Sequence, residues 1–189
     1  MALVPPHGGK GLVCCLLQGA ELAAEQKKAL GLKKIDISPR AKGDLIMMGI
    51  GGFSPLSGFM TKAGTFCPVP VTLDMDEEVK VGEEIALFDP KKGVYMATMK
   101  VAEVYEMTEA DKKWECEKVY KGQGEESSDA KFWEIAPKDH PGVQMVMAQK
   151  KFNVAGPVKV LSEGDYRDRF PGCYMTPAEA RKTFEEKGW

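Results

Sequence analysis

The residues best suited to chemistry are two histidines, and they are widely separated. His7 and His140 lie far apart in the sequence and form no His-x-x-His pair. A general acid or base must lie within hydrogen-bonding distance of its reactive partner, and neither histidine has a neighbouring motif that predicts one. We therefore interpret His7 as a residue that orders the N-terminal arm by hydrogen bonding, in preference to a catalytic residue.

The five cysteines also lack the spacing of a metal site or a disulfide framework. They show no Cys-x-x-Cys motif, and the adjacent Cys14 and Cys15 are poorly placed to bridge each other or to bind one metal ion. An odd number of cysteines without a signal peptide indicates a reducing cytoplasm and free thiols. We expect buried, inert thiols, with a metal site at Cys14 or Cys15 as the alternative. The five positions are Cys14, Cys15, Cys67, Cys116 and Cys173.

Glycines at positions 49, 51 and 52 superficially resemble a phosphate-binding loop. No third glycine follows at the required spacing, and no Gly-x-x-x-x-Gly-Lys-Ser/Thr motif is present. The surrounding stretch Met47–Met60 also contains Gly58, a proline at position 55 and two phenylalanines, residues that favour a sharp, packed turn. We interpret the stretch as a structural corner packed into a core.

Composition places the chain among ordinary globular proteins. It has 189 residues, of which 43% are hydrophobic and 29% charged, with a net charge of −2. This balance predicts no nucleic-acid partner and no anionic membrane surface as partner. Paired lysines near acidic residues indicate a solvated surface. No apolar run reaches the roughly 18 residues of a membrane span, so we expect a soluble, cytoplasmic protein.

Local signals predict four helices. Each is marked by a capping residue, by a terminal glycine or by a proline in its first turn. The first predicted helix is Ala20–Leu30, which ends before Gly31, and the second runs from Pro39 towards Met48 with Ser38 as its cap. The third runs from Thr108 to about Tyr120, and Asp111 completes its capping box. The fourth follows Thr176, with Pro177 at its first position, Glu179 completing the capping box and Gly188 at its end.

Apolar and β-branched runs predict the strands of an α+β fold. We expect a hairpin across the turn Pro90–Gly93, an edge strand where Pro68 and Pro70 interrupt a run, and a turn at Ala155–Pro157. Gly122–Asp129 is predicted to be a mobile surface loop. Trp133 lies in the longer connection Lys121–Asp139, and we expect it to anchor that connection by packing rather than to bind a ligand. The predicted strands are Val13–Leu17, Lys33–Ile37, Cys67–Leu73, Glu84–Phe88, Tyr95–Tyr105, Gln144–Gln149 and Val158–Leu161.

Several stretches resemble the N-terminal domain of sulfate adenylyltransferase, in the form found in sulfate-reducing bacteria. They are VPPHGGKGLV from Val4, ISPRAKGDLIMMGIGGFSPLSGFM from Ile37, PVPVTLD from Pro68, HPGV from His140, AGPVKVL from Ala155 and FPGCYMTPAEARKTFEEKGW from Phe170. The resemblance implies a mostly β, PUA-like pseudobarrel with peripheral helices over residues 1–165. Residues 166–189 would then be a linker and the first helix of a nucleotide-binding catalytic domain.

The same resemblance implies which chemistry is missing. In the family, a Gln-x-Arg-Asn-Pro type motif and a His-x-x-His motif bind ATP phosphates and sulfate, and the complete enzyme uses ATP with magnesium. Neither motif occurs in this sequence. We therefore assign no catalytic, substrate-binding or metal residue and no cofactor to this chain, and we expect it to be inactive alone. One departure is the short TKAGTFC join between Met60 and Pro68, which is longer in the family.

The leading hypothesis is thus a scaffold for a sulfate adenylyltransferase, a homo-oligomer in its complete form. Ala180 and Phe184, four residues apart, form an apolar stripe that must pack on a partner. Two alternatives remain: a PUA-like module that binds RNA, and a structural subunit that pairs with a separate catalytic chain.

Overall fold

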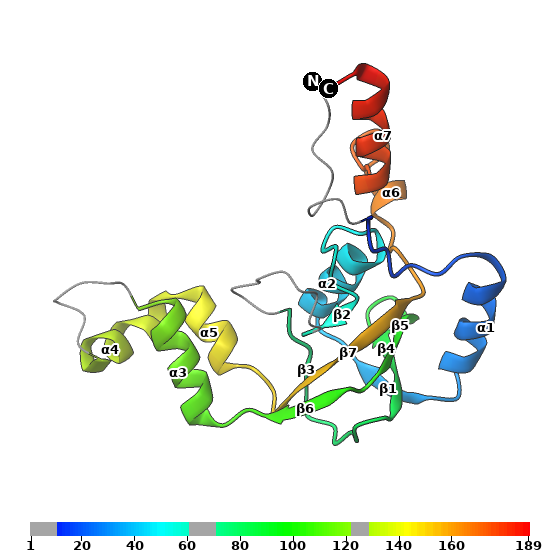
Figure 1. Cartoon of the computed structure of the whole chain (residues 1–189). Helices are drawn as coiled ribbons and strands as arrows, with labels where there is room; N and C mark the ends of the chain where they lie inside the picture. Colours follow the sequence, from blue (N-terminus) through cyan, green and yellow to red (C-terminus); the bar gives the residue numbers. More distant parts are fainter. Residues whose placement is uncertain (1–10, 61–70, 122–128) are drawn as a thin grey trace. The chain divides into compact units, whose positions relative to one another are not determined.

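The computed structural model describes residues 11–60, 71–121 and 129–189, so the join between Met60 and Pro68, His7 and most of the predicted loop lie outside the described residues. The chain forms two compact units (Figure 1). The first, here called the sheet unit, comprises Met1–Leu73, Val79–Val104 and Val154–Trp189. The second, here called the helical unit, comprises Asp74–Glu78 and Tyr105–Asn153.

One mixed sheet contains the seven strands of the described residues. Its main path runs β1-β4-β5-β7-β2, and β3 and β6 also pair with β7. The β1–β4 pair is parallel, whereas β4–β5, β5–β7, β2–β7 and β3–β7 are antiparallel. The strands are β1 (Lys33–Asp36), β2 (Gly58–Phe59), β3 (Asp74–Met75), β4 (Glu84–Asp89), β5 (Val94–Lys100), β6 (Glu103–Glu106) and β7 (Phe152–Val160). The predicted α+β class and the predicted hairpin across Pro90–Gly93 are confirmed.

Helices with strong local signals form where they were predicted. Ser38 Oγ accepts a hydrogen bond from Ala41 N at 3.1 Å to start α2 (Pro39–Gly49). Both capping boxes are formed, at Thr108 for α3 (Glu109–Val119) and at Thr176 for α7 (Pro177–Lys187). The first helix, α1, spans Gly19–Ala29, and a short helix, α6, spans Tyr166–Arg169. The starts of α2, α3 and α7 are fixed by caps from neighbours in sequence, whereas α1 and α6 have no side-chain cap.

The predicted strand Gln144–Gln149 is wrong, because this segment belongs to α5 (Pro141–Met147). His140 caps the helix and Pro141 occupies its first turn, and the apolar Val143 and Val146 face a small core. The expectation of a loop over Lys121–Asp139 is wrong for its second part, since Asp129–Asp139 form α4, which contains Trp133. Trp133 does pack on that core, and its Nε1 donates to Glu117 Oε1 at 2.7 Å.

The predicted turn at Ala155–Pro157 is wrong as well, because these residues lie inside the nine-residue strand β7. The predicted strand Tyr95–Tyr105 is divided into β5 and β6. Val13–Leu17 is not a regular strand, although Leu16 forms a single parallel bridge with Val160. Of the predicted strand Cys67–Leu73, the described part is irregular, and the strand begins instead at Asp74.

Glycines allow the backbones of the sheet unit to approach closely beside β7. Gly58 of β2 is opposite Pro157, and Phe59 is opposite Gly156. A Cβ on Gly58 would overlap the carbonyl oxygen of Gly156, and a Cβ on Gly156 would overlap the carbonyl oxygen of Lys100. Any larger residue at either glycine therefore forces β2 or β5 away from β7.

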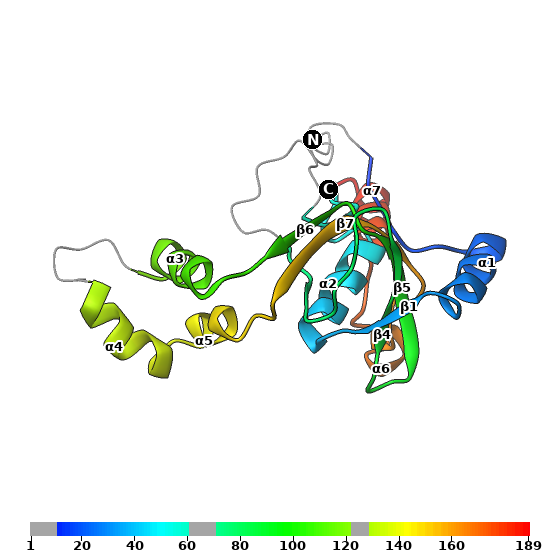
Figure 2. The same ribbon diagram turned by 90° about the horizontal axis from the view of Figure 1, so that it is seen from below.

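Helices cover both faces of the central strands. Figure 2 shows α1 and α2 on opposite sides of β4 and β5. Consecutive side chains of β5, Met96 to Met99, are buried, as expected for a strand packed on both faces. The alternation of apolar and polar residues in this strand was too mixed to assign one buried face, because both of its faces are buried.

A buried carboxylate attaches α1 to its face of the sheet. Glu25 is 8% exposed and accepts hydrogen bonds from Thr98 Oγ1 at 2.8 Å and from Lys159 Nζ at 2.9 Å. Thr98 and Lys159 are register partners on β5 and β7, so one carboxylate bridges both strands. Burial disfavours the charged carboxylate, but the bonds from Lys159 and Thr98 outweigh this and lower the pKa of Glu25.

We expect Glu25→Gln to lower the free energy of unfolding by about 1–3 kcal/mol at neutral pH, because it replaces charge-assisted hydrogen bonds. A carboxyl whose pKa is lower in the folded state stabilises the fold above its unfolded pKa of about 4.3, and this stabilisation is lost as pH falls through the folded pKa. Urea unfolding at several pH values should therefore show less acid sensitivity in Glu25→Gln. Glu21→Gln, an exposed change on the same helix, should behave like the parent chain; equal acid sensitivity in all three proteins would contradict the assignment.

We expect Gly156→Ala to destabilise the chain by about 3 kcal/mol or more, since the added methyl group meets backbone rather than a flexible side chain. Gly43→Ala is the matched control, because a Cβ at this helical position of α2 meets no atom within 4 Å. This control should be neutral or more stable by up to about 1 kcal/mol. The check is the urea midpoint of each variant, and similar midpoints for the two would refute the close approach.

Candidate functional site

The glycine corner lies where the sequence predicted it, and its backbone donors are already used. Gly52 N donates to Met47 O at 2.7 Å, and Gly51 N donates to Met48 O at 3.4 Å. Gly51 adopts a positive φ of 84°, which glycine tolerates. A phosphate-binding loop needs N–H groups that point at its ligand. The interpretation as a structural corner is therefore supported by the hydrogen bonds themselves.

His140, the histidine among the described residues, has a structural environment. Its Nδ1 accepts a hydrogen bond from Gly142 N at 3.1 Å, which caps α5. Its ring packs on Tyr120 with a centroid separation of 4.6 Å. Nδ1 of His140 is thus engaged in holding the start of α5.

The expectation of buried cysteines holds for only part of the described chain. Cys116 is buried in the core of the helical unit, Cys15 is half-buried, and Cys14 and Cys173 are exposed. Cys67 lies outside the described residues. Within the residues that the structure covers, no group of three or more His, Cys, Asp or Glu could hold a metal ion. In the same residues, no helix is long and apolar enough to cross a bilayer.

A buried ion pair beside the β4–β5 turn also has a structural role. Asp89 is 4% exposed, and its Oδ2 lies 2.7 Å from Lys42 Nζ. The contact with Lys42 lowers the pKa of Asp89 against the opposing effect of burial. Asp89 Oδ1 also accepts a hydrogen bond from Lys91 N at 2.9 Å. This pair shapes the turn that carries Lys92.

The feature with the clearest functional character is residues 162–189, here called the C-terminal segment. It contains α6 and α7, and no residue of either helix is buried. An isolated helix of the length of α7 is marginal in water, because tertiary packing supplies most helical stability. The segment exposes large apolar side chains at Tyr166 (38%), Phe170 (48%), Met175 (54%), Phe184 (41%) and Trp189 (62%).

A network of polar contacts orders the C-terminal segment. Arg167 Nη1 and Nη2 donate to the two carboxylate oxygens of Glu179, at 3.1 and 3.2 Å. Its Nε lies 3.6 Å from Glu163 Oε1, and its guanidinium carbon lies 5.0 Å from the centroid of the Tyr174 ring. Glu179 also caps α7 at Thr176. The hydrogen bonds from Arg167, and to a lesser extent those from Thr176, lower the pKa of Glu179 to about 2.

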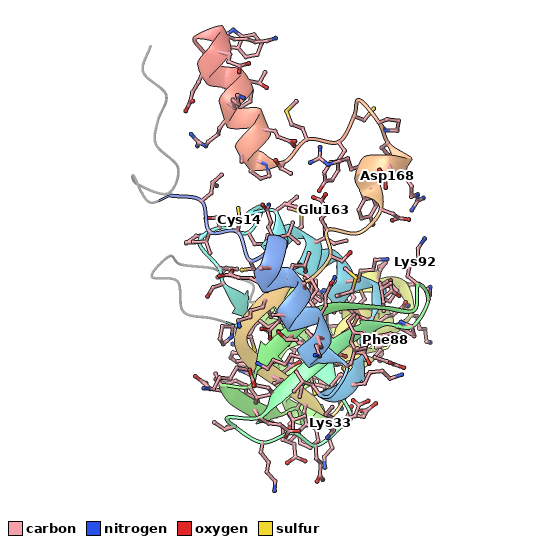
Figure 3. All side chains as sticks on the ribbon, turned by 90° about the vertical axis from the view of Figure 1, so that its right-hand side faces the viewer. Cys14, Lys33, Phe88, Lys92, Glu163 and Asp168 are labelled. Carbon is pink, nitrogen blue, oxygen red and sulfur yellow. The ribbon has the colours of Figure 1, made fainter. Side chains whose placement is uncertain are left out.

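A second contact attaches the segment to the sheet. Lys92 Nζ, on the turn between β4 and β5, lies 2.9 Å from Asp165 Oδ2 just before α6. Figure 3 shows Lys92 on this turn and Glu163 at the beginning of the segment. Gly164 packs against α2, since a Cβ there would lie 2.9 Å from Ile46 Cδ1.

Sequence reasoning found the α7 capping box and its apolar stripe, but missed the partners of Arg167 and Lys92. Helix caps follow a fixed spacing, whereas Arg167 and Glu179 are 12 residues apart and Lys92 and Asp165 are 73 apart. No periodicity relates such positions. The structure thus adds the contacts that hold the exposed segment in place.

These observations define a class: an α+β domain on a mixed sheet, followed by an exposed C-terminal segment. Residues 4–163 match the family model described as PUA-like domain. The chain belongs to the PUA-like domain family, as its resemblance predicted.

The sequence relatives are sulfate adenylyltransferases. The chain is 63% identical to that of Desulfovibrio desulfuricans, over 99% of this chain and 47% of the relative. It is 63% identical to that of Desulfatibacillum aliphaticivorans and 47% identical to that of Thiobacillus denitrificans, in each case over 99% of this chain, covering 48% and 46% of these relatives. The chain thus spans about half the length of the curated relatives it matches, and it is similar to their N-terminal part.

A solved structure supports the fold. It is described as a hexameric APS kinase from Thiobacillus denitrificans, and it matches with a TM-score of 0.67 at 24% identity. The match covers 100% of this chain and 32% of that one. At this identity, the likeness is evidence for the fold alone.

We expect alkylation of the native chain to modify Cys14 and Cys173 first and Cys116 only after unfolding. Burial, together with Glu115 and Glu117, raises the pKa of the Cys116 thiol and reduces its reactive thiolate form. Iodoacetamide labelling followed by peptide mass mapping, in the presence and absence of denaturant, measures this order. Rapid labelling of Cys116 in the native chain would contradict its burial in the core of the helical unit.

Proposed function

We propose that this chain is the non-catalytic, PUA-like scaffold of a sulfate adenylyltransferase. The complete enzyme would join ATP and sulfate to form adenosine 5′-phosphosulfate and pyrophosphate. The observation that carries this proposal is identity of 63% over nearly the whole chain with relatives that are about twice as long. The described residues contribute packing and docking surface, and the chemistry belongs to the part of the enzyme outside this chain.

The reaction itself explains why a scaffold is needed. A sulfate oxygen attacks the α-phosphorus of ATP and pyrophosphate leaves, so catalysis depends on in-line positioning and on donors aimed at developing negative charge. ATP and magnesium would be held by the catalytic part. Within the described residues, the glycine corner and Nδ1 of His140 make structural hydrogen bonds. This supports a structural role for the chain, with the chemistry in the catalytic part.

We further propose a boundary between residues 165 and 166. Residues 1–165 form the PUA-like domain, and residues 166–189 form a linker and the opening helix of the catalytic domain. Support comes from the family match, which ends at residue 163, and from α7, which has no buried residue. Exposed Phe184 and Trp189, whose rings stack at 6.2 Å, would pack against the catalytic part.

The partner is accordingly the catalytic part of the enzyme, in a complex that we propose is a homo-oligomer in the cytoplasm. The same apolar surface would also serve a separate catalytic chain. The net charge of −2 argues against RNA as partner, because phosphate contacts supply most non-specific affinity. A gel shift with RNA at low salt would reveal such binding if it existed.

We expect the purified 189-residue chain to show no sulfate-dependent exchange between ATP and pyrophosphate. Replacing the matching half of the Desulfovibrio desulfuricans enzyme with this chain should retain activity within about tenfold, because 63% identity preserves the docking surface. The same chimera with Phe184→Ser and Trp189→Ser should lose activity or fall apart during gel filtration. The intact relative is the control. Exchange activity in the isolated chain would overturn the proposal, and so would an inactive chimera that folds and assembles normally.

A further inference from the structure

The described residues of α7 include polar contacts that connect it to α6. A helix usually takes its direction from an apolar face that packs on its neighbours, but no residue of α7 is buried. Two hydrogen bonds from Arg167 to Glu179 connect α6 to α7, and the ion pair of Asp165 with Lys92 connects the start of α6 to the β4–β5 turn. A continuous path of polar contacts therefore leads from the sheet to α7.

The geometry of this pairing makes it more informative than an ordinary surface ion pair. Single exposed ion pairs contribute little, because water screens them and the side chains lose freedom. A planar guanidinium that donates to both oxygens of one carboxylate fixes an angle as well as a distance. Arg167 is held in turn from two other sides, by Glu163 and by the face of Tyr174. The guanidinium therefore has one preferred orientation.

We propose that Arg167 is a positioning residue whose paired hydrogen bonds to Glu179 set the direction of α7 relative to α6 and the β4–β5 turn. Its consequence for the enzyme, the placing of the catalytic part, rests on the proposed function. The positioning itself does not, since it concerns only this chain.

Glu179 offers a way to separate direction from helix formation. Its Oε2 accepts a hydrogen bond from Thr176 N at 2.8 Å, in addition to the bond from Arg167 Nη2. Glutamine also completes a capping box. Glu179→Gln therefore keeps the cap of α7 but removes the charge that pairs with Arg167. Arg169→Gln is the matched control for loss of an arginine, because Arg169 lies on the same short helix and packs on Phe170 at 5.3 Å. The attraction of Arg169 to Asp165 does not involve Glu179.

The test is nuclear magnetic resonance of the ¹⁵N-labelled 189-residue chain in a weakly aligning medium. In the parent chain and in Arg169→Gln, amide residual dipolar couplings of α7 should fit the same alignment tensor as those of β4 and β5. In Arg167→Gln and Glu179→Gln, the α7 couplings should shrink and cease to fit that tensor, while the α7 chemical shifts remain helical. Arg167→Lys keeps the charge but loses the paired N–H donors of the guanidinium, so its α7 couplings should lie between those of the parent and those of Arg167→Gln.

Three outcomes would overturn the proposal. The first is that the α7 couplings in Arg167→Gln and Glu179→Gln fit the common tensor as well as they do in the parent, and the second is that the parent itself fails to fit it. Loss of helical chemical shifts in both variants would assign the pairing to helix formation instead. Because the measurement needs neither ATP nor a catalytic partner, its failure is distinguishable from failure of the proposed function.

Discussion

Close contact between backbones beside β7 is the constraint on which the sheet unit depends. Gly58 and Gly156 remove the two Cβ atoms that would otherwise separate β2 and β5 from β7. β7 can then pair with both strands and accept the parallel bridge from Leu16. Most strand pairings in the sheet involve β7, so β7 determines where the other strands lie.

The register of β5 against β7 in turn determines how α1 attaches. Thr98 and Lys159 stand opposite each other, and the Glu25 carboxylate binds both. A register shift of one residue would turn these side chains to the other face, leaving a buried carboxylate without its partners at substantial cost. The backbone contact and the buried charge thus select the same arrangement, which is the consistency expected of a uniquely folded domain.

The core of the sheet unit and the C-terminal segment differ in how their side chains are covered. Buried charges of the sheet unit, such as Asp89 with Lys42, have partners. The segment after β7 instead exposes aromatic and aliphatic side chains on elements without a buried residue. Polar contacts through Arg167 order it without covering its apolar surface. In the proposed function this surface packs against the catalytic part of the enzyme, and relatives about twice as long as this chain support that proposal.

Near neighbours in the sequence were enough to predict the capped starts of α2, α3 and α7 and the hairpin across Pro90–Gly93, and ordered motifs predicted the family. The spacing of Ala180 and Phe184 also indicated an apolar stripe on α7. The folded chain was needed to show that Ala155–Pro157 is strand and that Gln144–Met147 is helix. It also revealed the pairings of Arg167 with Glu179 and of Glu25 with Lys159. The physical reason is range: caps and tight turns are satisfied within a few residues, whereas strand pairing and the partners of charged groups join segments that spacing in the sequence does not relate.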